Sequence, residues 1–247
     1  MKRVRLALIL ISVITFFCGC IVIGEEKGFP YKEIEDIQVV ELYPSYSIGF
    51  DDYAKKDLQN MKEYDWWSTL HPNNLTKFDL TTLASSTLNN SNSYKSNNLC
   101  DGKLETAWVE GAKGNGINEW AKINIDAYSS RSEFTSTPFS IFEVAVLSGY
   151  SKSLKTWTEN NRVKKLLLVI YSPQPSFHQK NEWAVFRLNL NDVDSLQVFK
   201  LPHGKISANY LDGLMKEIWL KIEDVYKGTK YDDTCISEFV AVGGFTN

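Results

Sequence analysis

The sequence predicts a mainly β protein, a β-sandwich preceded by a short helical N-terminal segment. Short apolar or alternating runs follow one another through the second half of the chain and are separated by turns, which is typical of a sandwich or barrel. No long helical run interrupts them, so a parallel α/β sheet is disfavoured. Aromatic residues make up 13% of the 247 residues, which suits an all-β core or a carbohydrate-facing surface.

The predicted strands lie between residue 119 and the C-terminus. The stretch EWAKINID alternates between polar and apolar residues, and we expect Trp120, Ile123 and Ile125 on its inner face. Others are richer in β-branched and aromatic residues, as strands require. The full set of predicted strands is 119–126, 139–149, 162–172, 182–190, 194–202, 216–226 and 236–245.

The N-terminus has the pattern of an export signal. A basic stretch, MKRVR, precedes the apolar run LALILISVITFF, which is shorter than the roughly 20 residues of a spanning helix. The run ends in FFCGC, where Gly19 precedes Cys20. A small residue before a cysteine is typical of a bacterial lipoprotein signal, so we expect 1–20 to be the signal peptide and Cys20 to carry the lipid. The alternatives are an ordinary signal peptide cut elsewhere and an uncleaved signal anchor.

Lipid on Cys20 would anchor the protein in a membrane of the bacterial cell envelope, either periplasmic or surface-exposed. Residues 21–82 are then expected to form a tether and a helical N-terminal segment. A helix is predicted at about 52–70, because apolar residues recur on one face after a capping aspartate. Trp66 and Trp67 on it are expected to dock the helix onto its domain, with sugar stacking as the alternative.

The cysteine count predicts one disulfide. Cys18 would leave with the signal and Cys20 would take the lipid, which leaves Cys100 and Cys235. An even pair in an exported protein is the number expected for one bridge. The alternative is two buried free thiols.

Three blocks of sequence resemble a known family. The turn from Asn98 through Asp101, Gly102 and Thr106 to Trp108 has the form Asn-x-x-Asp-Gly-x-x-x-Thr-x-Trp of galactose-binding-like, discoidin-type jelly rolls. Three stretches narrow the match to one family, the bacterial NADase-type glycan-binding domain, which the chain resembles. They are TAWVEGAKGNGINEWAKINI, LSGYSKSLKTWTENNRVKKLLLVIY and VYKGTKYDDTCISEFVAVGG.

The resemblance implies that 83–247 is a discoidin-like β-sandwich that binds a ligand. It covers about two-thirds of the chain, in three blocks in the same order. One departure is Asn118-Glu119, where the family usually has Gly-Glu. Nothing in the chain adds the glycohydrolase that accompanies the domain elsewhere, so NAD cleavage is not implied.

The Asp-Gly turn is a candidate structural calcium site. Asp101 and Thr106 can direct oxygens inward and the loop adds carbonyls, which suits an ion that takes six to eight oxygen ligands. In calcium-binding relatives a glutamate of the last strand completes the site, and the resemblance puts Glu238 in that place. The alternative is a structural turn in which Asp101 accepts hydrogen bonds from its own loop.

Candidate ligand-binding residues lie on two loops. Glu110 and Glu119 flank the glycine-rich stretch GAKGNG, and a long loop is expected at 149–166. Its aromatic and amide side chains can stack on sugars and bond hydroxyls. The candidates on this loop are Tyr150, Trp157, Asn161 and Arg162. Asn161 and Arg162 can equally fix the loop to the sandwich.

Several function classes are disfavoured. The formal net charge is −3, so a nucleic-acid footprint is not expected. No His/Cys cluster has zinc spacing, no Gly-x-Ser-x-Gly elbow is present, and the glycines do not form a dinucleotide fingerprint. We expect a non-catalytic lipoprotein that binds a glycan or another cell-surface ligand. The alternative is a protein–protein interaction or adhesion module without sugar binding.

Overall fold

The computed structural model describes residues 28–49, 79–126, 139–172, 182–202, 207–208 and 216–245. The predicted signal peptide with Cys20, the predicted helix at 52–70 and its two tryptophans lie outside these ranges. Within the described ranges, no helix is both long enough and apolar enough to cross a bilayer.

Twelve strands and five short helices make up the described part of the chain. The helices are α1 (Tyr31–Ile34), η1 (Leu88–Asn90), η2 (Asn92–Tyr94), η3 (Ser96–Cys100) and α4 (Leu154–Glu159). The strands are β1 (Val40–Leu42), β2 (Tyr46–Gly49), β3 (Asp79–Ala84), β4 (Trp108–Val109), β5 (Trp120–Asp126), β6 (Phe139–Ser148), β7 (Asn161–Ser172), β8 (Glu182–Asn189), β9 (Ser195–Lys200), β10 (Ser207–Ala208), β11 (Lys216–Tyr226) and β12 (Thr234–Phe245).

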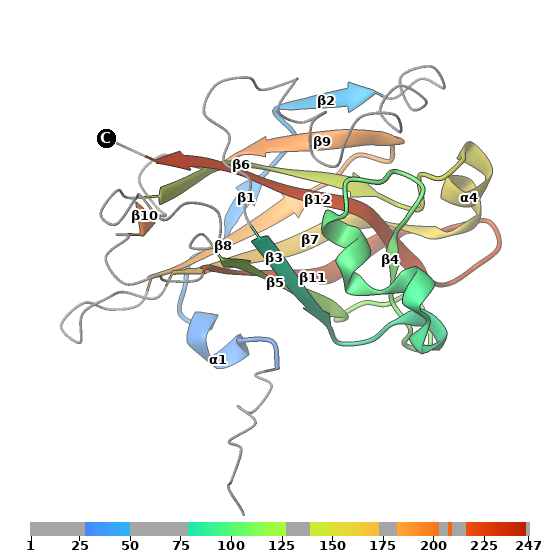
Figure 1. The fold of residues 1–247 in the computed structure, drawn as a ribbon, viewed down its shortest axis with the longest axis horizontal. Coiled ribbons are helices and arrows are strands. Elements are labelled where there is room, and N and C mark those ends of the chain that lie inside the picture. Colours follow the sequence, from blue (N-terminus) through green and yellow to red (C-terminus); the bar gives the residue numbers. More distant parts are fainter. Residues whose placement is uncertain are drawn as a thin grey trace, which may run out of the picture.

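The strands form a sheet that curls into two facing halves (Figure 1). One half has the order β2-β9-β6-β12, with β4 added to β12 and β10 to β6. The other runs β3-β5-β11-β7-β8, with β1 parallel to β8. A short parallel pairing of Thr234 and Cys235 with Asn161 and Arg162 joins the halves. The predicted galactose-binding-like β-sandwich is therefore confirmed.

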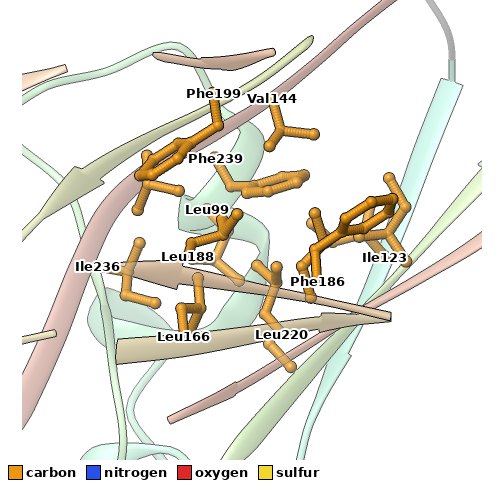
Figure 2. Packing of buried hydrophobic residues seen from close by; sticks show 14 of the residues in the cluster. Leu99, Ile123, Val144, Leu166, Phe186, Leu188, Phe199, Leu220, Ile236 and Phe239 are labelled. Carbon is orange, nitrogen blue, oxygen red and sulfur yellow. The ribbon is translucent and has the colours of Figure 1, made fainter. Parts of the chain in front are cut away.

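The main core lies between the two halves. Figure 2 shows Val144, Phe199 and Phe239 from one half facing Leu166, Leu188 and Leu220 from the other. The sequence of β11 shows why. Ile218, Leu220 and Ile222 alternate with polar or amphipathic residues, so one face of the strand enters the core. Burial of such side chains contributes about 1.5–3 kcal/mol each.

The segment before the predicted domain boundary at residue 83 is part of the sandwich. Strand β1 extends one half, β2 extends the other, and β3 begins at Asp79. Between the helix α1 and β1, Ile37 and Val39 pack on the outer face of the sheet, beside Phe29 and Trp219. This cover explains the near-continuous apolar run in β7, which is buried on both faces.

Two local expectations, for Trp120 and for the loop at 149–166, differ from the structure. Trp120 lies on the outer face against Trp219, with ring centroids 5.1 Å apart, because strand alternation puts it opposite to Ile123. The Asn/Ser-rich stretch at 85–98 forms 3₁₀ turns, and the side chain of Asn98 is buried. The expected loop at 149–166 contains α4, which Ser153 and Thr156 start with a reciprocal capping box.

We predict that Phe29→Ala lowers the free energy of unfolding by about 3 kcal/mol, because it removes a buried ring from the outer face. The Phe29 side chain is 7% exposed, and its ring meets that of Trp219 edge-on at 6.0 Å. Urea denaturation measures the change. Tyr43→Ala is the control: its side chain is 68% exposed, so an effect below about 0.5 kcal/mol is expected. If Phe29→Ala changed the free energy of unfolding as little as Tyr43→Ala, the N-terminal segment around Phe29 would not be part of the cooperative fold.

Candidate functional site

Loops and short helices gather at one end of the sandwich, which we call the loop end (Figure 1). It comprises the η helices, the Asp-Gly turn (101–107), β4, the glycine loop (111–118), α4 with residues 149–153 before it, and the loop 227–233. Gly228 approaches Asn160 so closely that a Cβ would lie 2.5 Å from its carbonyl carbon, which joins two of these loops. All the predicted metal and ligand residues fall at this end or next to it.

The Asp-Gly turn is closed by its own hydrogen bonds. Asp101 Oδ1 accepts from the backbone N–H of Lys103 at 3.0 Å, and Thr106 Oγ1 lies 2.9 Å from both carboxylate oxygens of Asp101. Gly102 has φ +70°, which favours glycine. Asn98 donates to the carbonyls of Ser93 and Ala107, both at 2.8 Å, and so fixes the start of the turn.

Glu238 of β12 reaches this turn from the sheet. Its side chain is fully buried, and its Oε2 accepts from the Gly102 N–H at 3.1 Å. Its other oxygen, Oε1, is buried without a hydrogen-bond partner among the described residues. Burial, and then the charge of Asp101, raise the pKa of Glu238 well above its usual value, and burial also raises the pKa of Asp101.

The fold thus brings the three predicted metal ligands, Asp101, Thr106 and Glu238, to one place. The described part of the chain holds no group of three His, Cys, Asp or Glu side chains that could bind a metal ion. A cation here would therefore depend on two carboxylates supplemented by hydroxyl and carbonyl oxygens. That donor set fits calcium and not zinc.

The predicted disulfide between Cys100 and Cys235 is not formed. Both residues are free, buried thiols. Cys100 packs in the main core beside Ile236, whereas Cys235 packs against Ala107 and Val109. Neighbouring residues of a strand point to opposite faces, so Cys235 faces away from the side on which Ile236 and Cys100 lie. Burial raises the pKa of both thiols and so keeps them protonated.

Glu110 is fully buried and holds the glycine loop. Its carboxylate accepts from the N–H groups of Ala112 at 2.8 Å and Thr234 at 3.0 Å. Burial raises its pKa, although both hydrogen bonds oppose that shift. Gly116 has φ +68°, and a Cβ there would lie 2.5 Å from the Glu110 side chain, so only glycine fits.

Glu119 holds the other end of the same loop. Its Oε2 accepts from the hydroxyls of Ser85, at 2.6 Å, and of Ser86. Ser86 also accepts from the Gly111 N–H at 2.9 Å. The two glutamates predicted as ligand contacts thus form hydrogen bonds within the protein and shape the loop between them.

Trp157, Asn161 and Arg162 fix loops to the sandwich. Asn161 is 1% exposed, donates to the Asp232 carbonyl at 2.6 Å and accepts from the Gly228 N–H at 2.7 Å. Arg162 stacks 4.4 Å over the Trp157 ring and pairs with Asp192 at 2.7 Å. The Trp157 indole donates to the Ser148 carbonyl at 3.0 Å. Of the two functions considered for Asn161 and Arg162, the structure favours loop fixation.

Tyr150 is half-buried and packs against the cluster of Ala107, Val109 and Cys235. Its ring meets that of Tyr94 edge-on, with centroids 6.5 Å apart. Burial is the main cause that raises the pKa of Tyr150; the nearby Tyr94 and Cys235 add to it, and the charge of Glu105 adds least. Glu105 Oε2 is itself buried without a hydrogen-bond partner among the described residues.

Sequence reasoning missed Tyr94, Glu105, Thr234 and Ser237. Tyr94 is the one aromatic residue in an Asn/Ser-rich stretch, and an aromatic side chain in a polar loop is a signal that could have been used. Thr234 and Ser237 stand at strand positions where a hydroxyl is ordinary, so no sequence signal distinguishes them.

Comparisons with known proteins agree with this fold. Residues 76–242 match the family described as the NAD glycohydrolase translocation F5/8 type C domain. A search of curated protein sequences gave no match.

Three solved structures are similar to the chain at low identity. A GH29 fucosidase of Ruminococcus gnavus in complex with fucose shares 14% identity, with 68% of this chain and 26% of that chain covered and a TM-score of 0.38. The CBM32-1 and CBM32-2 domains of Clostridium perfringens ZmpB, in complex with GalNAc, share 10%, with 85% and 42% covered and a TM-score of 0.37. The C-terminal domain of a Bacteroides fragilis chitobiase shares 17%, with 69% and 95% covered and a TM-score of 0.39. The chain thus spans about a quarter of the fucosidase and less than half of the ZmpB fragment.

We predict that, in a chelating buffer, the protein is more stable at pH 5.5 than at pH 7.5, and that Glu238→Gln reduces this difference. A carboxyl group whose folded pKa is raised binds its proton more tightly in the folded state. Its contribution to stability is full below the unfolded pKa of about 4.3 and is lost as the pH rises through the folded value. Denaturant unfolding at several pH values measures this, and an unchanged slope in the variant would contradict it.

Proposed function

Because the chain belongs to the NAD glycohydrolase translocation F5/8 type C domain family, we propose that it is a non-catalytic glycan-binding protein with its ligand site at the loop end. We propose further that lipid on Cys20 holds it at a membrane of the bacterial cell envelope. The tether between Cys20 and Gly28, the first described residue, spans at most about 30 Å when fully extended. The sandwich would then work close to that membrane.

The observation that carries the proposal is the pair of half-buried rings of Tyr94 and Tyr150, which meet edge-on with centroids 6.5 Å apart. Aromatic rings present apolar faces to the C–H faces of a sugar. Small-ligand sites commonly have such aromatic walls.

Binding without hydrolysis is supported by the state of the two loop glutamates. A glycosidase needs two carboxyl groups that flank the bond to be cleaved, one to protonate the leaving oxygen and one to act as nucleophile or base. Glu110 is fully buried and accepts backbone hydrogen bonds with both oxygens. Glu119 is engaged by two serine hydroxyls. Both glutamates are thus used in hydrogen bonds within the protein, which supports binding without hydrolysis.

Calcium is proposed as a structural ion at the Asp-Gly turn, held by Asp101, Thr106 and Glu238. The unpartnered, buried Glu238 Oε1 beside a second carboxylate supports this, because such an arrangement is costly without a cation. The ion would supply positive charge between the carboxylates and stiffen the turn. It would perform no chemistry on the ligand.

A second candidate function is protein binding without sugar. Three large apolar side chains are exposed on loop-end segments: Ile117 at 42%, Leu154 at 69% and Tyr231 at 42%. Exposed apolar groups are one mark of protein contact surfaces when they form a patch. The protein-binding hypothesis predicts that a partner protein remains bound after its glycans are removed.

We predict that the chain from residue 21 onward binds a small group of glycans on an array, and that Tyr150→Ala and Tyr94→Ala each weaken this binding roughly tenfold through loss of the aromatic contact. Tyr43→Ala is a matched control, since Tyr43 is 68% exposed and lies outside the loop end. A folded protein that binds no glycan, with or without calcium, would favour protein binding instead.

We also predict that millimolar calcium raises the melting temperature by about 5 °C, the shift expected if the ion binds the folded state alone and is present at roughly 100 times its Kd. Asp101→Asn should abolish the shift, and magnesium should give little of it, because the smaller ion prefers a rigid octahedral shell. Equal melting temperatures in calcium and in chelator would remove the ion from the proposal.

A further inference from the structure

The first five residues of β12, Thr234–Glu238, contact three separate segments of the loop end. Thr234 bonds to the glycine loop, Ser237 bonds to residues 149–151, and Glu238 bonds to the Asp-Gly turn at Gly102. We call residues 234–238 the anchor segment. It lies in the sheet, where β12 pairs with β4, β6 and β7. Loops attached to it are therefore attached to a segment that is held by pairing with three strands.

Thr234 holds the glycine loop with three groups. Its hydroxyl donates to the Asn115 carbonyl at 2.8 Å, its N–H donates to Glu110 Oε1 at 3.0 Å, and its carbonyl accepts from the Glu110 N–H at 3.2 Å. The Thr234 side chain is fully buried. Asn115 is near the tip of the loop, so this single hydroxyl fixes a point that the bonds at either end of the loop do not reach.

Ser237 holds the segment that carries Tyr150. Its hydroxyl donates to the Gly149 carbonyl and accepts from the Ser151 N–H, both at 2.9 Å. Tyr150 lies between these two bonded residues. The Ser237 side chain is fully buried, and the Gly149 N–H also donates to the Cys235 carbonyl at 2.9 Å. The backbone on both sides of Tyr150 is thus fastened to β12.

The anchor segment does not keep one regular alternation along its length, because Ile236 and Phe239, three residues apart, both pack in the main core. Its side chains reach three different segments: Thr234 the glycine loop, Ser237 residues 149–151, and Glu238 the Asp-Gly turn. Hydroxyl side chains suit this task, because each can both donate and accept inside the protein without burying a charge.

We infer that Thr234 and Ser237 are positioning residues, each of which sets the geometry of one loop of the loop end: Thr234 the glycine loop, and Ser237 the residues around Tyr150. The statement that these loops face a glycan rests on the proposed function. The positioning of the loops by the two hydroxyls is supported by their hydrogen bonds alone. Neither hydroxyl needs to touch a ligand.

Hydrogen exchange of the ligand-free chain from residue 21 onward tests the inference. Thr234→Val keeps the shape of the side chain and removes the donor, so amide exchange in 111–118 should rise about fivefold to tenfold, as expected for one lost hydrogen bond, while 149–153 stays unchanged. Ser237→Ala should do the reverse. Thr234→Ser, which restores the hydroxyl, should return exchange in 111–118 to within about twofold of the parent protein.

Ser172→Ala is the matched control for Ser237→Ala. Ser172 is equally buried, lies at the opposite end of β7 from the anchor segment, and has no partner for its hydroxyl among the residues that the structure describes. This change should leave exchange in both loops unaltered. If Thr234→Val does not fold, Ser237→Ala and its control carry the test.

Two results would overturn the inference: unchanged exchange in the loop assigned to each hydroxyl, or equal opening of both loops in either variant. The second result would mean that the changes loosen the whole loop end and position nothing in particular. Failure to find a glycan ligand would count against the proposed function alone, because exchange is measured without ligand.

Discussion

The pairing of β12 with three other strands is the constraint on which the rest of the structure depends. Its residues Ile236 and Phe239 contribute to the core, while its first residues join the two halves of the sheet through β7. The side chains of Ser237 and Glu238 in the same strand bond to different loops. One strand thus supports the core, the joint between the halves and the loop end. It also separates Cys235 from Cys100.

Buried carboxylates have two different functions at the loop end. Glu110 is balanced by two backbone N–H donors, so its charge is used to hold the glycine loop. Glu238 has one such donor in hydrogen-bond contact and one oxygen without a partner, and Asp101 adds a like charge nearby. A buried carboxylate that lacks partners is stable when it is protonated or meets a cation. That difference is why the metal proposal rests on Glu238 and not on Glu110.

The N-terminal segment changes how the sandwich is stabilised. Phe29 and the residues after it cover the outer face of β7 and β11, and β1 and β2 then pair with the free edges of β8 and β9. Covered edges are protected from pairing with other chains. Arg187 of β8 reinforces the edge through ion pairs with Glu41 of β1 and Glu223 of β11. The sandwich is therefore larger than the segment matched by the family.

The sequence by itself determined the strands and the turn. Alternation in stretches such as that of β11 depends on local periodicity, and the Asp101-Gly102 turn depends on backbone preferences, so both are readable without a fold. Only the tertiary structure decided the roles of side chains. Glu110 and Arg162 resemble ligand residues in sequence, yet their hydrogen-bond partners, Thr234 and Asp192, are distant in the chain. Contacts of that kind are created by sheet pairing, and composition and spacing carry no record of them.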